Sequence, residues 1–555
     1  MSQIKIIGLG GLDEVGKNMY VVEIGDNIFI LEAGAKFPNP KEQLGVEIIV
    51  PDFSYLIENK KRIKGIFITH GHDDVMGAIP YLLKSINAPV YATSLTAKLI
   101  KNTVVKHKVK NCNINIIKRE HRFIVAGITI QSFPLTQSIP DGIGIAIHTE
   151  HGAIVLASKF IVDYDIHNEH FSCDIGRIAE IGKNGVFALL TESSGAATLG
   201  HTSPRHKITP LIERHIDNTL GKIFITIYKE DVFHMVEIVE LAKKLNKKIY
   251  CYDEAQYKLF EMICSLGYYK LNKKLFINKK EFVECEQDAI CIISGTKTRV
   301  FKRLHRIALR EDELIQFKET DVVIIASPPS FESEIEATNT ENDLYKEGVK
   351  VINYNAKQLF KMQSSIEDLK MLIYLLKPKY YIPVNGEYQQ LIANANLAID
   401  MKYTPDKVIV LDNGQNVLFI DGRLRNTREF IELEETLIDG NEKLDVGGLV
   451  LKDREILSTD GVIVVGIVID FKTKELIGGA DVQSRGVIYL KDADYIVKNL
   501  GEILIEAVKN AVKENRYENI KIRQEAKMKM SRYMAKETGK RPMILPAILE
   551  INTDR

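Results

Sequence analysis

The sequence has no excess of either charge and no long apolar run. Its 555 residues include 74 lysines and arginines and 74 aspartates and glutamates. This balance gives no overall attraction to nucleic acid, although a local basic surface could still bind it. No window reaches 18 consecutive apolar residues, which excludes an ordinary membrane-spanning helix. The start, MSQIKIIGLGGL, lacks the charged and apolar segments of a signal peptide, so we expect a cytoplasmic protein with no membrane partner.

Cysteines are few and scattered. The six cysteines form no CxxC pair, which is typical of free thiols in a reducing compartment rather than of a disulfide framework. The length predicts about three or four domains at the usual domain size. A hydrophobic content of 45% is enough to give each of them a core.

The order of the expected elements divides the chain into parts. Residues 1–208 contain short β-branched strands separated by turns, such as NIFILEAG and AIVLAS. Residues 209–370 alternate helices with buried strands, as in MVEIVELAKKLNKKIYCYDE and ELIQFKETDVVIIASPP, which indicates α/β units. The charged stretch 427–445 is typical of a linker. From about residue 446, strands followed by helices predict a small α+β domain.

One short segment, GIFITHGHDDVMGA at 65–78, carries metal-binding residue types. His70 and His72 follow an apolar strand whose end would hold the loop rigid, so both imidazoles could reach one metal ion. Asp74 could then serve a second ion. The alternative is a polar turn whose side chains cap a helix that begins near Val75. The strand, THGHDD and the helix start GAIPYLL together favour descent from a metal site.

Several longer motifs resemble the ribonuclease J family: GLGGLDEVGKNMYVVE, LEAGAKFP, SIPDGIGIAIHT, LKPKYYIPVNGEY, DREILSTDGVIVV and KRPMILPAILEI. The resemblance implies an α/β fold, with an αββα metallo-β-lactamase sandwich formed by residues 1–208 and 371–445. An α/β β-CASP domain at 209–370 would be inserted into it, and a small α+β domain at 446–555 would follow. Working members are 5′→3′ exoribonucleases with endonuclease activity in rRNA maturation and mRNA turnover.

The same resemblance indicates lost metal ligands. Family enzymes use two divalent ions, zinc or manganese, to orient the phosphate and lower the pKa of the attacking water. His70, His72 and Asp74 match three ligands, and Asp74 is the residual catalytic position. Four other ligand positions hold unsuitable or weak donors: Val75, Gln137, Lys159 and Asn385.

Lys159 is the most informative of these changes, because the family has a bridging aspartate there. An ammonium about 4 Å from a divalent cation is repelled by roughly 8 kcal/mol at an effective dielectric near 20. We therefore expect Lys159 to fill the vacated pocket and pair with Asp74. Two ions should not bind, and at most one ion should bind weakly.

The family loop that binds the RNA phosphate, HxSGH, has lost both histidines. Its positions correspond to Leu359, Phe360, Lys361, Met362 and Gln363. The family motif GSQGE has become GTKTR at residues 295–299. Glu32 and Glu192 are milder changes.

Two functions remain open. One is an active, metal-dependent 5′→3′ exoribonuclease with a reduced one-metal site. The other is a partner subunit with weak or absent activity, which binds RNA and forms a homodimer or a hetero-complex with an active ribonuclease J paralogue in an RNA degradosome. The lost ligands favour the second. The basic stretch 521–541 could contact RNA phosphates, but a solvated helix face is the better prediction.

Overall fold

The structure is a computed structural model. It describes residues 2–38, 46–110, 112–217, 219–285, 289–426, 429–439, 442–443, 449–487 and 494–552. The chain divides into two compact units, Met1–Phe37 with Ile48–Thr436 and Pro38–Glu47 with Leu437–Arg555. Within the described ranges, no helix is long and apolar enough to cross a membrane.

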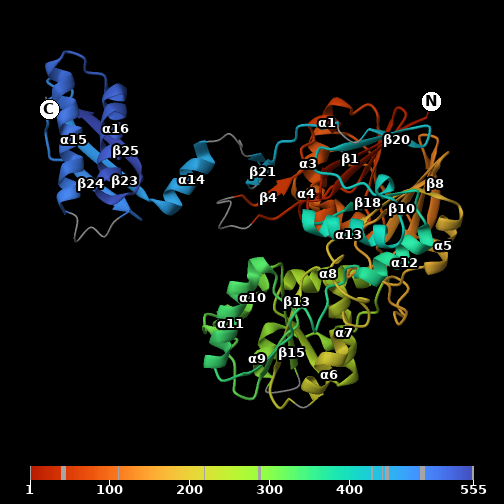
Figure 1. The fold of residues 1–555 in the computed structure, drawn as a ribbon. Coiled ribbons are helices and arrows are strands. Elements are labelled where there is room, and N and C mark those ends of the chain that lie inside the picture. Colours follow the sequence, from red (N-terminus) through yellow and green to blue (C-terminus); the bar gives the residue numbers. More distant parts are fainter. Residues whose placement is uncertain are drawn as a thin grey trace. The chain divides into compact units, whose positions relative to one another are not determined.

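Two β-sheets form the centre of the first unit (Figure 1). The larger has the order β20-β19-β1-β2-β3-β5-β6-β7 and the smaller the order β18-β12-β11-β10-β9-β8. Their facing sides bury one shared core that includes Phe29, Phe67 and Phe187. The larger sheet consists of β1 (Gln3–Gly10), β2 (Met19–Ile24), β3 (Asn27–Leu31), β5 (Ile63–Phe67), β6 (Val90–Ala92), β7 (Ile114–Ile116), β19 (Asn416–Ile420) and β20 (Arg423–Asn426). The smaller consists of β8 (His121–Val125), β9 (Ile128–Pro134), β10 (Ile143–Thr149), β11 (Gly152–Ala157), β12 (Val186–Glu192) and β18 (Tyr380–Val384).

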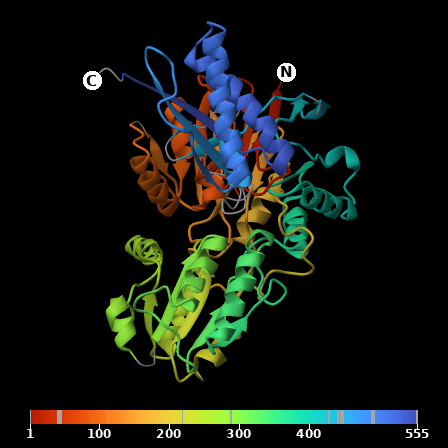
Figure 2. The same ribbon diagram turned by 90° about the vertical axis from the view of Figure 1, so that its left-hand side faces the viewer.

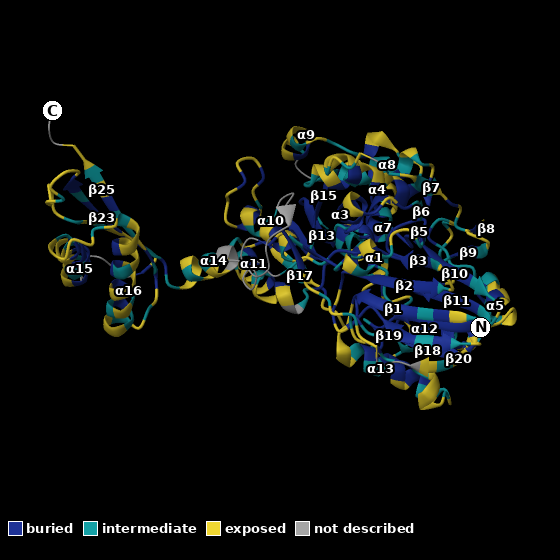
Figure 3. Ribbon diagram, turned by 90° about the horizontal axis from the view of Figure 1, so that it is seen from above, coloured by how far each residue is buried: buried dark blue, intermediate teal, exposed yellow. Residues whose placement is uncertain are grey.

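Helices cover the outer sides of these sheets (Figure 3). On the smaller sheet, α5 (Ile175–Lys183), α12 (Ile366–Leu376) and α13 (Tyr388–Asp400) bury a second core. Beside β6 and β7 lie α3 (Ile79–Ser85) and α4 (Ser94–Lys106). The short α1 (Ser54–Glu58), α2 (Asp73–Met76), β4 (Ile48–Val50) and η3 (Pro405–Lys407) complete this part. The predicted αββα sandwich is confirmed.

The inserted segment contains a parallel sheet with the order β14-β15-β13-β16-β17. Helices on both faces bury its strands (Figure 2), which explains why the strands are uninterrupted apolar runs. The strands are β13 (Ile223–Tyr228), β14 (Lys248–Cys251), β15 (Ala289–Gly295), β16 (Val322–Ile325) and β17 (Lys350–Asn353). The helices are α6 (Thr209–Asp217), α7 (Val232–Lys244), α8 (Glu254–Ser265), α9 (Lys279–Glu284), α10 (Thr298–Ala308) and α11 (Glu334–Lys346), with η1 (Lys273–Leu275) and η2 (Phe331–Ser333).

One predicted helix in this segment is wrong. Residues 313–317, ELIQF, form no helix. The carboxylate of Asp312 instead accepts hydrogen bonds from the backbone N–H groups of Leu314 (3.1 Å) and Ile315 (2.9 Å), which stabilise a turn. The buried position of Ile315 explains the apolar pattern without a helix.

The second unit contains a three-stranded sheet with the order β24-β23-β25. Its strands are β23 (Val462–Asp470), β24 (Asp481–Arg485) and β25 (Met543–Ile551), and its helices are α14 (Leu449–Thr459), α15 (Asp494–Lys513) and α16 (Asn519–Thr538). The predicted α+β domain is confirmed, but α14 was not foreseen. The stretch expected as a linker contains β21 (Thr436–Asp439) and β22 (Glu442–Lys443), while residues 427, 428, 440, 441, 444 and 445 lie outside the described part.

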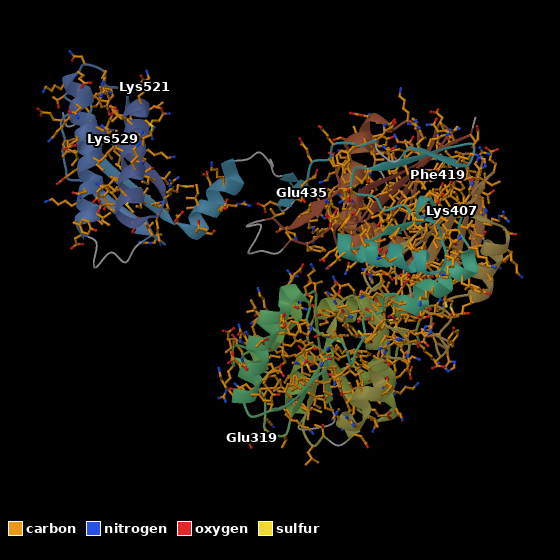
Figure 4. All side chains as sticks on the ribbon, in the orientation of Figure 1. Glu319, Lys407, Phe419, Glu435, Lys521 and Lys529 are labelled. Atoms are coloured by element: carbon orange, nitrogen blue, oxygen red, sulfur yellow. The ribbon has the colours of Figure 1, made fainter. Side chains whose placement is uncertain are left out.

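The basic helix α16 has a buried side and a charged side. Ile522, Met530 and Met534 pack into the core of the domain. Lys521 pairs with Glu518 (2.6 Å) and Lys529 with Glu525 (2.8 Å), and both lysines stand on α16 in Figure 4. These local ion pairs fit the solvated face that the sequence predicted.

Candidate functional site: a remodelled metal pocket

The histidine loop follows β5 and is fixed by its backbone. The N–H of Ala33 donates to the carbonyl of Val75 (2.8 Å), and the N–H of Asn18 donates to that of Asp74 (3.2 Å). A Cβ atom on Gly34 would lie 1.7 Å from the Asp74 oxygen, so only glycine fits. Helix α2 begins at Asp73, and no side chain caps it at His72. The helix-capping alternative is therefore wrong, and these side chains are free for another role.

The three predicted ligands converge. One ligand atom from each of His70, His72 and Asp74 lies within 4.8 Å of the others. Nε2 of His70 and Nδ1 of His72 are 3.1 Å apart. Both rings are buried, and burial lowers the pKa of both, that of His72 to about 4. Both imidazoles are consequently neutral near pH 7, the form that binds a metal.

Neighbouring groups assign the protons of this pair. The Thr69 hydroxyl donates to Glu32 (2.7 Å), so it accepts from Nδ1 of His70 (2.8 Å). Nε2 of His72 lies 3.3 Å from the carbonyl of Glu230, which can only accept, so a proton on Nε2 would give this contact a hydrogen bond. The lone pairs of the other two nitrogens then face each other. This is an arrangement that a cation between the rings would satisfy.

Lys159 occupies the opposite side of the pocket, in the turn after β11. Its Nζ lies 2.5 Å from Oδ2 of Asp74, as the sequence predicted, and the two side chains are 24% and 18% exposed. Burial alone would raise the pKa of Asp74, but the charge of Lys159 lowers it well below the usual range. Burial alone would lower the pKa of Lys159. The charge of Asp74 outweighs burial, so the pKa of Lys159 is raised. The pair is therefore ionised at every ordinary pH.

The remaining changed positions are buried and offer little to a metal. Val75 is fully buried and has no donor atom. Gln137 donates from Nε2 to the carbonyl of Lys159 (2.7 Å), and its Oε1 has no partner among the described residues. Asn385 has a left-handed backbone (φ 53°), which asparagine tolerates, and its buried amide also lacks a partner there. The donor set does not fit two ions.

Two buried glutamates support the pocket from behind. Burial, against the hydrogen bond from Thr69, raises the pKa of Glu32 to about 7. Glu192 accepts hydrogen bonds from the backbone N–H groups of Phe160 (3.1 Å) and Ser364 (2.8 Å). Glu192 thus connects the Lys159 turn to the end of the predicted phosphate loop. The sequence identified both glutamates as substitutions but could not show that one of them carries this connection.

The predicted phosphate loop, residues 359–363, follows β17 and precedes α12, and it is partly packed rather than open. Leu359 and Met362 are buried, and the Phe360 ring stacks 3.8 Å from the guanidinium carbon of Arg205. Lys361 extends over the Tyr228 ring at 5.9 Å. The chain turns back at Gln363, whose N–H donates to the carbonyl of Lys361 (2.8 Å). Lys361 is the one basic side chain that this loop offers.

The sequence reasoning missed two contacts of the site. The hydroxyl of Ser138 lies 3.3 Å from Nε2 of His72 and donates to the carbonyl of Glu230 (3.1 Å). Ser138 stands in the SIPD motif, which could have signalled it. Glu230 comes from the inserted domain and has no motif of its own, so only the fold brings it to His72.

Family models match all three parts of the chain. The metallo-β-lactamase superfamily model matches residues 12–126, the ribonuclease J β-CASP model residues 220–343, and the ribonuclease J C-terminal model residues 449–551. Together with the sandwich and its inserted parallel sheet, these matches define a metallo-β-lactamase protein of the β-CASP class.

Close full-length relatives specify the family. The chain is 34% identical to "Ribonuclease J 2" of Staphylococcus saprophyticus over 99% of this chain and 98% of the relative. The same identity and coverage hold for "Ribonuclease J 2" of Staphylococcus aureus and of Staphylococcus epidermidis. The chain belongs to the ribonuclease J family. A crystal structure of a protein of unknown function from Enterococcus faecalis shares the fold over 75% of this chain and all of its own, with a TM-score of 0.53 at 13% identity.

Proposed function

We propose that this chain is an RNA-processing subunit whose own hydrolytic activity is weak or absent. It serves rRNA maturation and mRNA turnover in the cytoplasm, as the partner of an active ribonuclease J within an RNA-degrading complex, and it also forms homodimers. The observation that carries this proposal is the ion pair between Lys159 and Asp74. We also propose domain boundaries near residues 208, 370 and 445.

The ion pair competes directly with a metal ion. An ion at Asp74 would have to displace an ammonium that sits 2.5 Å from the same carboxylate oxygen. The displaced ammonium would remain close to the ion, because the Lys159 turn is fixed through Phe160 and Glu192. The repulsion at such a distance amounts to several kcal/mol, which weakens any binding through two imidazoles and one shared carboxylate.

RNA binding can persist without metals, because lysines gather in the same region. The side chain of Lys361 is exposed in part. Its pKa is lowered, first by the packed protein atoms around it and second by the positive charges of Lys159 and Lys297. Lys297 follows the carboxyl end of β15, and Tyr228 beneath Lys361 ends the neighbouring β13. The carboxyl ends of parallel strands are the usual ligand edge of such sheets, and lysines there suit phosphate groups.

The second candidate function is a slow 5′→3′ exoribonuclease that uses one ion. The close approach of Nε2 of His70 and Nδ1 of His72, 3.1 Å apart, favours it, because a cation between the two rings would accept both lone pairs. Such an ion would be zinc or manganese, and it would supply Lewis-acid chemistry when bound. His70, His72 and the free oxygen of Asp74 would hold it.

Metal analysis and RNA degradation separate the two functions. We expect less than one equivalent of zinc or manganese per purified chain, and little degradation of 5′-monophosphorylated RNA. Asp74→Ala should then leave the rate of RNA degradation unchanged. The matched control Asp406→Ala, in an exposed turn, should leave it unchanged as well. Two bound equivalents, or robust degradation that only Asp74→Ala removes, would return the chain to the active enzymes.

The partner role has its own test. Mixing this chain with an active ribonuclease J at micromolar concentrations should yield a stable complex on size exclusion, with RNA degradation by the complex retained in Asp74→Ala. Separate elution of the two proteins would refute the partner role and leave the metal argument unaffected.

A further inference from the structure

One stretch of the first unit carries positive charge without any balancing acid. Residues 75–119 contain seven lysines and one arginine but no aspartate or glutamate, although the whole chain has as many acidic as basic residues. The side chain of Arg119 is engaged with the protein itself, because it donates to the carbonyls of Gly142 (3.4 Å) and Ser172 (2.6 Å). Six of the lysines lie on or directly after two neighbouring helices, and all six are exposed. We call them the basic face: Lys84, Lys98, Lys101, Lys106, Lys108 and Lys110.

The charges of the basic face are open to solvent and unpaired. Helix α4 buries Ile100 and Val104 on its inner side, while Lys98, Lys101 and Lys106 stand exposed on its outer side. The first and the last of these lysines are about 12 Å apart along the helix axis. None of the six lysines forms an ion pair with another residue of the part that the structure describes. Their charges therefore remain available to a ligand.

The lysines are close enough to act together. Lys84 lies in the last turn of α3 and Lys106 in the last turn of α4, and the two helices pack against each other. The pKa of His107 is lowered, first by burial and second by the charges of Lys84 and Lys106. The N–H of Lys108 donates to the carbonyl of Val105 (3.1 Å), which fixes the turn that continues the row. The basic face is thus one region of like charge, which attracts an anion.

Protection of a sheet edge does not explain this charge. Strand β7 is the free edge of the larger sheet, and lysines on an edge strand commonly prevent it from pairing with another chain. The lysines of the basic face, however, stand on two helices and in the turn before β7. A helix has no row of unpaired backbone groups along its side, so a bound anion is the better explanation.

The residue types of the basic face suit the phosphates of an RNA duplex. Tyr91 is the one tyrosine, phenylalanine or tryptophan in residues 84–119, and its ring stacks on that of Phe67 in the core, with centroids 4.8 Å apart. Single-stranded RNA is typically held by bases that stack on exposed aromatic rings, which this stretch does not supply. Ammonium groups bind phosphate oxygens without reading the bases, and duplex RNA is recognised largely through its shape and its phosphates.

Helix α4 connects the basic face to the histidine pocket. Leu99 packs on the loop between the two histidines, so closely that a Cβ atom on Gly71 would lie 2.6 Å from the Leu99 side chain. From this contact, the exposed lysines follow α4 to its last residue, Lys106, and continue into the next turn. An RNA with one end at the pocket would have its body alongside this helix.

We propose that the basic face binds the double-helical body of an RNA, outside the pocket and independently of base sequence. This inference deepens the proposed RNA-processing role and rests on it, because it assigns one part of RNA binding to one surface. Each lysine that contacts a phosphate displaces counterions, so the binding should weaken steeply with salt. The competing occupant is an acidic protein surface, since Val105 stands among the lysines and is 69% exposed.

Removal of three charges from α4 tests the proposal. The full-length triple variant Lys98→Gln, Lys101→Gln and Lys106→Gln should bind a blunt, 5′-hydroxyl RNA duplex of about 16 base pairs at least about tenfold more weakly than the unaltered chain. The slope of log affinity against log salt should become shallower by about two to three. Fluorescence anisotropy of the labelled duplex measures both. Arginines at the same three positions keep the charge and should retain the binding.

The matched control removes three lysines from a different helix. Lys498→Gln, Lys509→Gln and Lys513→Gln on α15 change the net charge by the same amount, and this variant should bind the duplex within about twofold of the unaltered chain. Equal weakening of both triple variants would show that net charge alone matters and would overturn the proposal. Undiminished duplex binding by the α4 variant would overturn it as well.

Two further measurements separate this inference from the proposed function. If the unaltered chain bound single-stranded 5′-monophosphorylated RNA but not the duplex, the basic face would be refuted and the subunit role would stand. If it bound neither RNA, the RNA-processing role itself would fail. An α4 variant that binds the duplex normally but no longer binds an active ribonuclease J would assign the basic face to a protein partner and refute the RNA. Metal content and RNA degradation do not enter any of these outcomes.

Discussion

The two sides of the histidine pocket are held in place in different ways. On one side, His70, His72 and Asp74 form a ligand-like arrangement. On the other side, Lys159 pairs with Asp74, and the buried amide of Asn385 has no partner among the described residues. The difference teaches that backbone packing preserves the first side: Gly34 and the hydrogen bonds of Asp74 and Val75 fix the loop with or without metal. On the second side, the charge of one side chain, Lys159, sets the electrostatics beside Asp74.

The largest effect should come from making the second side resemble the first. Lys159→Asp replaces repulsion by a further carboxylate, so the affinity for manganese or zinc should rise at least about 100-fold. Titration calorimetry measures it. The control Lys407→Asp, in the exposed turn η3, should not change metal affinity. If Lys159→Asp bound metal no better than the control, Lys159 would not be what excludes the ions.

Removing the charge without replacing it should cost stability. Lys159→Met leaves Asp74 ionised and unpaired, which should lower the free energy of unfolding by about 2–3 kcal/mol, less than for a fully buried pair because both side chains are partly exposed. Urea unfolding of the first unit measures this. Adding Asp74→Asn should recover most of the lost stability. If Lys159→Met left the free energy of unfolding unchanged, the ion pair would contribute nothing to stability.

The Glu32 carboxyl should make stability depend on pH with a defined sign. Its pKa of about 7 lies above the ordinary value of 4.5, so the folded state holds the proton more tightly than the unfolded state. Stability should therefore fall as the pH rises from about 4.5 to 7, by up to about 3 kcal/mol from this group. Glu32→Gln should flatten that part of the profile in thermal melts between pH 5 and 8. An equally steep profile in Glu32→Gln would assign the slope to other groups, such as Glu230, whose pKa burial also raises to about 7.

The smallest effect is expected where only one lost ligand is restored. Val75→His supplies an imidazole beside His72, but Lys159 still pairs with Asp74, so degradation of 5′-monophosphorylated RNA should not increase measurably. A rate near that of an active ribonuclease J would contradict the role given to Lys159. Val75→His combined with Lys159→Asp is the informative companion variant.

Much of the fold could be predicted because its signals are local. The predictions for the strand-rich first part and for the alternating segment MVEIVELAKKLNKKIYCYDE were correct. Burial on one or both faces of an element produces a regular spacing of apolar residues, which the sequence shows directly. The helical segment predicted at the start of ELIQFKETDVVIIASPP was wrong, because Asp312 stabilises a turn there instead. The pairing of Lys159 with Asp74 was predictable only through the family resemblance, since 84 residues separate them.

The sequence by itself determined which chemical groups the pocket can offer a metal ion: two imidazoles, one carboxylate and one ammonium. Val75 offers no donor atom. Only the tertiary structure decided how they are used. It brought the carbonyl of Glu230 to within 3.3 Å of His72 and the ammonium of Lys159 to within 2.5 Å of Asp74. The physical reason is that donor chemistry belongs to a residue, whereas distance, desolvation and exposure depend on which distant segments pack together.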